Sequence, residues 1–225
     1  MADDAPLTLL EAELLTPAWT DADVAFVDVL AKRLGLPAEE LLLPLASESK
    51  LNPRARNPND PKGWPVAVGL FQMSRSAAQG MGLIPLNGPA KPEDGDAYAV
   101  SDPRPTFGPW KELADDFLRW SPMRQLQLFE RYLGATGFTA QPGGIGKWDT
   151  AARIYQAVAA SSTLNPYVVP TRDTVVYPAG SAGYAGNTAL DLDGNGVITF
   201  GDLTDAVNAM RKEPAYRALL KRLRG

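Results

Sequence analysis

Apolar residues recur at three- and four-residue intervals in several segments of this chain, and Pro- and Gly-rich stretches separate those segments. In residues 20–34, for example, Val24, Val27 and Leu30 share this spacing, and Gly35 follows the segment. Such spacing places the apolar side chains on one face of an α-helix, and a glycine commonly ends a helix. The pattern therefore predicts a mainly α-helical protein.

Further helices are predicted on either side of a turn-rich region. One runs from about residue 37 to 50 and contains Pro44, which we expect to bend it. Asn-Pro and Asp-Pro steps and the sequence WPVAVGLFQM favour turns and a short hairpin over residues 52–72. Ser76 is predicted to cap a short helix, which a long loop follows. Later helices are predicted at residues 110–120, 121–135 and 148–160.

A Pro-, Gly- and Ser-rich stretch lies between the last of these helices and the C-terminal residues. We expect a main helical domain over residues 1–164 and a linker or extended packing arm over residues 165–186. A compact C-terminal module should occupy residues 187–225. The sequence thus predicts one sizeable core with a small appendage.

The composition excludes several kinds of chemistry, because the chain has no cysteine and no histidine. Cysteine nucleophiles, Ser-His-Asp triads, histidine zinc sites and disulfides are therefore impossible. Proton transfer is left mainly to carboxylates, lysine and tyrosine, and metal binding to oxygen ligands. A formal net charge of −4 gives no reason to expect a nucleic-acid partner. We also expect no signal peptide and no transmembrane segment.

Glu48 stands out because it follows an almost wholly apolar run at the predicted end of a helix. Helical spacing places it on the same stripe as Leu41 and Leu45. Burial and the helix C-terminus both disfavour a negative charge, so the pKa of this carboxyl should be raised. A protonated glutamate in a cleft can act as a general acid. The alternative is that Glu48 pairs with the nearby Lys50 or Arg54.

Several short motifs around Glu48 resemble those of the lytic transglycosylase family, which has the goose-type lysozyme fold. They are the ES pair Glu48 and Ser49, the NP pair Asn52 and Pro53, Ala55, AVGLFQMS at residues 67–74, SPMRQLQLFERYL at 121–133 and AARIYQAV at 151–158. The resemblance covers roughly residues 22–160. It differs after Tyr155, where Gln156 and Val158 stand in place of the family's asparagine and glycine.

This resemblance implies a peptidoglycan-degrading enzyme that cleaves the β-1,4 bond between N-acetylmuramic acid and N-acetylglucosamine. Glu48 would be its single catalytic acid and base, and Ser49, Gln72 and Tyr155 would hold the glycan strand or orient Glu48. Such enzymes form a 1,6-anhydro ring in place of attack by water. One alternative is a hydrolytic lysozyme or endolysin that uses a second, loop carboxylate; candidates are Asp60, Asp94, Asp96 and Asp102. Another is an inactive virion structural protein.

The segment DLDGNGVITFGD at residues 191–202 matches the spacing of an EF-hand-like calcium loop. The predicted ligands are Asp191, Asp193, Asn195, the Val197 carbonyl, Thr199 and Asp202. Because position twelve is Asp and a poor helix precedes the loop, a structural, dockerin-like calcium is expected. No metal is expected in catalysis. The alternative is a loop closed by Asx turns without metal.

The expected fold class is therefore mainly α, that is, α+β lysozyme-like: a helical domain with a short hairpin, followed by a small calcium loop-helix module. The C-terminal residues should form a helix with a basic face made of Arg217, Lys221 and Arg224. This face is either simply solvated or binds an acidic partner, cell-wall polymer or anionic membrane surface. A wall enzyme without an export signal suggests delivery by a bacteriophage particle, with tail proteins as possible partners and a virion (tail or baseplate) location.

Overall fold

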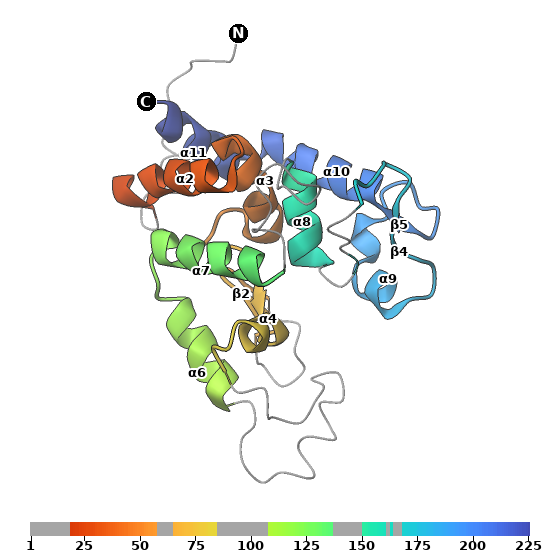
Figure 1. The fold of residues 1–225 in the computed structure, drawn as a ribbon, viewed down its shortest axis with the longest axis horizontal. Coiled ribbons are helices and arrows are strands. Elements are labelled where there is room, and N and C mark those ends of the chain that lie inside the picture. The colour runs from red at the N-terminus through yellow and green to blue at the C-terminus, as the bar shows by residue number, and fades with distance from the viewer. Residues whose placement is uncertain (1–18, 58–64, 85–107, 137–149, 161–162, 164–167) are drawn as a thin grey trace.

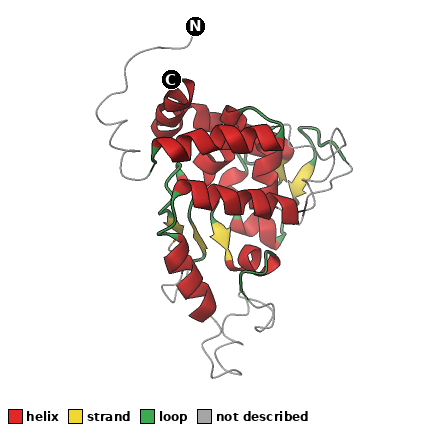
Figure 2. Ribbon diagram, turned by 60° about the vertical axis from the view of Figure 1, so that its left-hand side comes forward, coloured by secondary structure: helices red, strands yellow, loops and turns green. Residues whose placement is uncertain are grey.

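The protein is mainly α-helical, as the apolar periodicity predicts (Figures 1 and 2). The computed structural model describes residues 19–57, 65–84, 108–136, 150–160, 163 and 168–225. The helices are α2 (Asp21–Leu34), α3 (Ala38–Ser49), α4 (Arg75–Gly80), α6 (Gly108–Phe117), α7 (Pro122–Ala135), α8 (Ala151–Ala159), α9 (Ala182–Gly186), α10 (Phe200–Ala209) and α11 (Pro214–Arg224). Short 3-10 turns, η3 (Thr188–Leu190) and η4 (Met210–Lys212), flank α10.

Local capping signals determine where α2 begins and ends. Thr20 is the N-cap, and its side chain and that of Asp23 form a reciprocal capping box. Asp23 also accepts a hydrogen bond from the backbone N–H of Met123, which joins the starts of α2 and α7. Gly35 ends α2 in the left-handed region, with φ 71°. The predicted bounds of this helix are confirmed.

Helix α3 is the central helix of the fold. Its residues 41–46 are all buried, so this part of the helix has no side that faces solvent. Other elements must therefore cover it all round. It packs against α2, α8, α10 and α11, which surround it in Figure 1. Pro37 is the N-cap rather than the first helical residue, and Pro44 lies within the helix. This central position explains why the segment that leads to Glu48 is so apolar.

A small antiparallel sheet follows α3 in the chain. It has the order β1-β2-β3, formed by β1 (Arg56–Asn57), β2 (Ala67–Val68) and β3 (Met73–Ser74). Ala67 pairs with Ser74 and Val68 with Met73, so residues 69–72 form the turn of the predicted hairpin. Helix α4 begins two residues earlier than predicted, because Ser74 and not Ser76 accepts the capping hydrogen bond, from the N–H of Ala77.

The C-terminal residues share their core with the rest of the chain. Strand β4 (Val175–Tyr177) pairs with β5 (Ile198–Thr199), so the predicted arm is partly a strand. Helix α10 packs against α8 and α3, and α11 packs against α2 and α3. The buried side chains of Leu203, Val207 and Leu219 belong to the same hydrophobic cluster as α3. The part of the chain beyond residue 187 is therefore packed onto the helical domain.

The predicted basic face of α11 lies partly beside acidic residues. Of this face, Arg224 has its Nη2 3.9 Å from Oε1 of Glu39. Arg222, which is not part of the predicted face, forms an ion pair with Asp21 at 2.8 Å. Just before α11, Arg211 pairs with Glu40 at 2.7 Å. These contacts join the C-terminal helices to the first turns of α2 and α3. Across the described residues, no helix is long and apolar enough to span a membrane.

Candidate functional site

Glu48 lies in the last turn of α3, next to the helix C-terminus. Its side chain is only partly exposed and is surrounded by protein, and this desolvation raises the pKa of its carboxyl to about 8. Among the described residues no basic side chain pairs with it. Lys50 instead turns toward Glu213, with its Nζ 3.4 Å from Oε2. Glu48 therefore has no ion-pair partner among the described residues, and its raised pKa favours the protonated form at neutral pH.

Tyr155 on α8 faces the end of α3. It is buried, with 6% of its surface exposed, and its pKa is raised to about 12 by desolvation and then by the nearby charge of Glu48, while a hydrogen bond with Ser47 acts in the opposite direction. The phenol is thus protonated at any physiological pH. The structure therefore brings together Glu48 and Tyr155, two of the residues predicted for the site, with Ser47 beside them.

The side chain of Ser49 is hydrogen-bonded within α3 itself. Its hydroxyl donates to the carbonyl of Leu45 at 2.9 Å, and only 7% of the residue is exposed. This bond caps a carbonyl at the end of α3. Its predicted contact with a substrate stays a prediction.

Gln72 ends the hairpin turn between β2 and β3. The turn needs a left-handed residue at each end, with φ 76° at Gly69 and φ 47° at Gln72. The Gln72 side chain donates from Nε2 to the carbonyl of Gly69 at 3.0 Å. The Gln72 side chain is therefore held by the backbone of the same turn. A non-glycine residue at positive φ is strained, and such strain often accompanies a functional site. No hydrogen bond or ion pair among the described residues joins Gln72 to Glu48.

Gln125 on α7 is a residue that the sequence analysis did not identify. It is fully buried, and its Oε1 accepts from the N–H of Leu70 at 2.9 Å. Its Nε2 donates to the carbonyls of Pro53 at 2.9 Å and Phe117 at 3.1 Å, with Trp120 at 3.3 Å. One side chain therefore ties the loop after Glu48, the hairpin turn and the end of α6 together. Because glutamine is usually a surface residue, only its place within an apolar helix face could have indicated this role.

A pocket of about 440 Å³ lies between β3, α4, α7, α8 and β4, and none of Glu48, Gln72 and Tyr155 lines it. Its walls come from β3 and α4, from α7, from the last turn of α8 and from β4; they are Ser74, Ser76, Ala77, Gly80, Met81, Tyr132, Ala135, Thr136, Val158, Ala159 and Tyr177. The hydroxyls of Tyr132 and Tyr177 donate to the carbonyls of Ala157 and Ala159, which holds both rings against α8. The pocket thus combines aromatic rings with Ser and Thr hydroxyls, a lining suited to a sugar.

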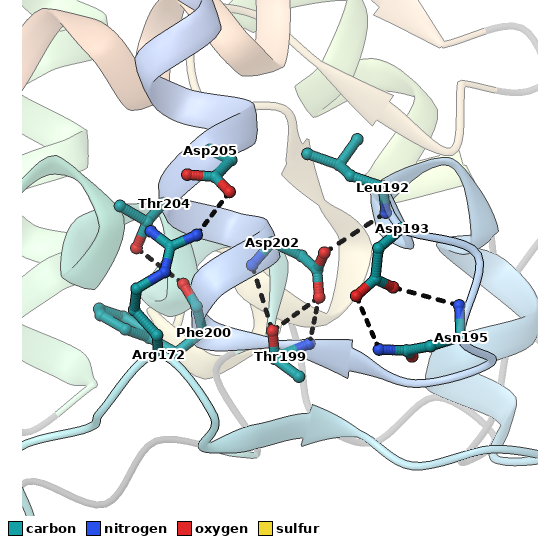
Figure 3. Close-up of polar contacts among 9 residues, drawn as sticks. All are labelled: Arg172, Leu192, Asp193, Asn195, Thr199, Phe200, Asp202, Thr204 and Asp205. Atoms are coloured by element: carbon teal, nitrogen blue, oxygen red, sulfur yellow. Dashed lines mark hydrogen bonds and ion pairs between the residues drawn. The ribbon is translucent and has the colours of Figure 1, made fainter.

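The predicted calcium loop is closed by its own side chains, as Figure 3 shows for Asp193, Asn195, Thr199 and Asp202. The carboxylate of Asp191 accepts from the N–H groups of Asn195 and Gly196 and from the Tyr184 hydroxyl. The Tyr184 bond is the largest cause that lowers the pKa of Asp191, so this carboxylate is ionised at neutral pH. The loop therefore holds the ionised carboxylate of Asp191 against its own backbone N–H groups.

The end of the loop is also the start of α10. Thr199 is the N-cap, and its hydroxyl and the Asp202 carboxylate form a capping box. Oδ1 of Asp202 also accepts from the N–H of Leu192, which closes the loop, and β5 places Val197 just before the paired strand. No three acidic groups in the described part of the chain converge on one point. The donors are nevertheless all oxygen atoms, the kind that calcium prefers, and calcium binding stays a prediction.

The arrangement can carry out proton transfer between a carboxyl and a bound oxygen atom. Glu48 can donate near neutral pH, and Tyr155 can orient it or hydrogen-bond a ligand. The loop carboxylates considered as partners, Asp60, Asp94, Asp96 and Asp102, lie outside the described residues. A scan of protein-family models, a search of curated proteins and a search of solved structures each give no match to this chain. Function is therefore inferred from the residues of the chain itself.

Proposed function

We propose that this protein is a peptidoglycan lytic transglycosylase with a lysozyme-like fold, in which Glu48 is the single catalytic acid and base. The observation that carries the proposal is the position of Glu48 in the last turn of α3, facing Tyr155, where desolvation raises the pKa of its carboxyl to about 8. A carboxyl with an ordinary pKa would be almost wholly ionised at neutral pH and would be a poor proton donor. The sequence motifs around both residues support the same function.

The proposed reaction needs only one proton carrier. Glu48 protonates the glycosidic oxygen as the bond from that oxygen to C1 of the muramoyl sugar breaks. The resulting carboxylate then takes the proton from the muramoyl 6-hydroxyl, while the oxygen of that hydroxyl forms a bond to C1. Glu48 is thereby restored, no water is consumed, and the product carries a 1,6-anhydro ring. The high pKa suits the first step because it keeps a proton on Glu48 near neutral pH. It suits the second step because it favours return of the proton to Glu48.

The pocket between the hairpin and α8 supports a glycan substrate. Val158 and Ala159 follow Tyr155 by three and four residues on α8, so they lie on the same helix face. Ser74 follows Gln72 by two residues. The pocket therefore adjoins the segments that carry Gln72 and Tyr155, and a sugar bound in it could stack on a tyrosine ring.

The hydrolytic alternative differs in its product and in its need for a second carboxylate. The pKa of Glu48 is shifted by burial, with no contribution from another described carboxylate. The four loop carboxylates that the hydrolytic alternative would use lie outside the described residues. Mass spectrometry of digested cell wall distinguishes the two, because anhydromuramoyl ends come from a transglycosylase and reducing ends from a hydrolase.

The decisive variant is Glu48→Gln, which keeps the shape of the side chain and removes the acid. We expect at least a hundredfold loss of glycan cleavage in a zymogram and in the release of anhydromuropeptides. Glu112→Gln on α6 is the matched control, because Glu112 is exposed and far along the chain from the site. Equal activity of Glu48→Gln and the wild type would rule out the catalytic assignment. An inactive wild type would favour the virion structural protein instead.

We also propose that calcium is a structural cofactor of this enzyme. Asp191, Asp193, Asn195, Thr199 and Asp202 would hold it with their side-chain oxygens and Val197 with its carbonyl. The ion would supply positive charge to the loop and takes no part in proton transfer. Because Thr199 and Asp202 also cap α10, it would stabilise the start of a helix that packs against α8 and α3.

A further inference from the structure

The backbone that follows Glu48 has an unusual conformation. Lys50 and Leu51 both lie in the left-handed region, with φ 55° and φ 60°, although neither is glycine. L-residues with a side chain rarely occupy this region, and two in succession are held there only by their surroundings. Glu48 lies two residues before Lys50, in the last turn of the same helix. Contacts that hold this turn therefore also set the direction of the Glu48 side chain.

One of these contacts comes from Trp19, which lies outside α3. Its indole Nε1 donates to the carbonyl of Leu51 at 2.9 Å. Trp19 is 3% exposed and Leu51 is 1% exposed, so water cannot replace the bond if the donor is removed. The two residues are 32 positions apart in the sequence. Trp19 thus fixes the left-handed turn from outside α3.

The C-terminal helix in turn holds Trp19. Nη1 of Arg222 on α11 donates to the carbonyl of Trp19 at 3.1 Å, and its Nη2 pairs with Asp21 at 2.8 Å. The other side of the turn is also contacted from the C-terminal residues, because Lys50 pairs with Glu213. The strained turn is therefore held between two contacts that depend on α11 and the residue before it.

We propose that Trp19 is a positioning residue for Glu48, and that Arg222 of α11 keeps Trp19 in place. The inference rests on the proposed function, in which Glu48 is the acid. Without the indole N–H, the carbonyl of Leu51 loses its partner and the turn relaxes toward an ordinary conformation. The last turn of α3 then moves, and Glu48 loses its alignment with Tyr155, the titratable group that faces it. Lys50 keeps its ion pair with Glu213 in this variant.

The test compares two conservative variants, Trp19→Phe and Trp110→Phe. Both tryptophans are 3% exposed, and the indole of Trp110 donates to the carbonyl of Pro65 at 2.9 Å, so both variants lose an equivalent bond. We expect Trp19→Phe to lower kcat on soluble glycan strands about ten- to a hundredfold with KM within about twofold, as for a misaligned catalytic group. Trp110→Phe should leave kcat near that of the wild type.

A second readout is independent of activity. The carboxyl carbon of Glu48, followed by NMR against pH, should titrate at least one pH unit lower in Trp19→Phe, because a displaced carboxyl gains water. An unchanged Glu48 titration in folded Trp19→Phe overturns the inference, whatever the activity. If Trp19→Phe does not fold, Arg222→Met should lower the Glu48 pKa in the same direction, and an unchanged value there overturns it too. If the wild type cleaves no glycan but the titration responds, the positioning role stands and the proposed function fails.

Discussion

Tyr155 of α8 faces Glu48 of α3, close enough that the charge of Glu48 raises the pKa of the phenol. The two residues are 107 positions apart, since 155 − 48 = 107, and they come from adjacent helices of one core. Both remain protonated at neutral pH. Of these two O–H groups, that of Glu48 loses its proton first as the pH rises.

The activity should depend on pH through Glu48. Because the acid must be protonated to act, kcat/KM should be constant below about pH 7 and fall as the pH rises through about 8. The rate of cleavage of soluble glycan strands from pH 4 to 10 measures this. An alkaline limb near the ordinary carboxyl value of 4.5 would show that Glu48 is not held in a desolvated site.

Glu48→Gln should make the protein more stable at high pH. The folded-state pKa of about 8 lies above the ordinary 4.5, so the unfolded chain releases this proton first and stability falls as the pH rises between these values. Removing the carboxyl removes that loss, which is about 2–4 kcal/mol once partial exposure to water is allowed for. Urea unfolding at pH 4 and pH 9 should show the gain at pH 9 only. A gain of the same size at both pH values would point to another cause.

Gln125→Leu should destabilise the fold by about 2–4 kcal/mol, because it leaves the buried N–H of Leu70 and the carbonyls of Pro53 and Phe117 without their partner. Gln127→Leu is the control on the same helix, since Gln127 is exposed, and it should change stability by less than about 0.5 kcal/mol. Denaturant unfolding of both variants measures the difference. Equal effects would mean that the hydrogen bonds of Gln125 contribute nothing specific.

Gly69→Ala should cost about 3 kcal/mol. A Cβ at this position would lie 2.6 Å from Oε1 of Gln125 and against the Phe117 ring, at a φ of 76° that alanine disfavours. Gly80→Ala is the contrast, because nothing lies within 4 Å of its added Cβ and alanine favours a helix. It should be neutral or stabilising. Thermal unfolding of the two variants decides whether the hairpin turn is as tightly enclosed as the contacts indicate.

Calcium should raise the melting temperature. At a calcium concentration a hundredfold above Kd the stabilisation is about 2.7 kcal/mol, or roughly 5–10 °C for a chain of this size. Chelation should reverse it, and Asp191→Asn should abolish it. Asp28→Asn, in an exposed pair on α2, should keep the full response. The same melting temperature with calcium and with chelator would mean that the loop binds no calcium and is closed by Asx turns alone.

The sequence predicted the elements whose signals are local. Thr20 and Gly35 mark α2, and Ser121 with Pro122 marks the start of α7, because caps act within a few residues. Helix α4 was misplaced by two residues because two serines compete for one cap. The pairing of Met73 and Ser74 with β2 decides between them, and this depends on another strand.

The site was predictable only in part. The high pKa of Glu48 follows from its apolar neighbours in α3, which the sequence displays. The burial of Gln125 and the bond from Trp19 to Leu51 require chain segments far apart in sequence to meet, and no local pattern encodes them. The positive φ of Gln72 was missed for a similar reason, because it depends on the packing around a turn of four residues.

The bond between Arg222 and Asp21 joins residues 201 positions apart. Closing so long a loop is slow, because chain entropy must be lost before the contact forms. The left-handed turn after Glu48 depends on the same contacts, through Trp19. A chain emerging from the ribosome would therefore form its early helices well before the turn after Glu48 is held in place, and the proposed site would be complete only after α11 has docked.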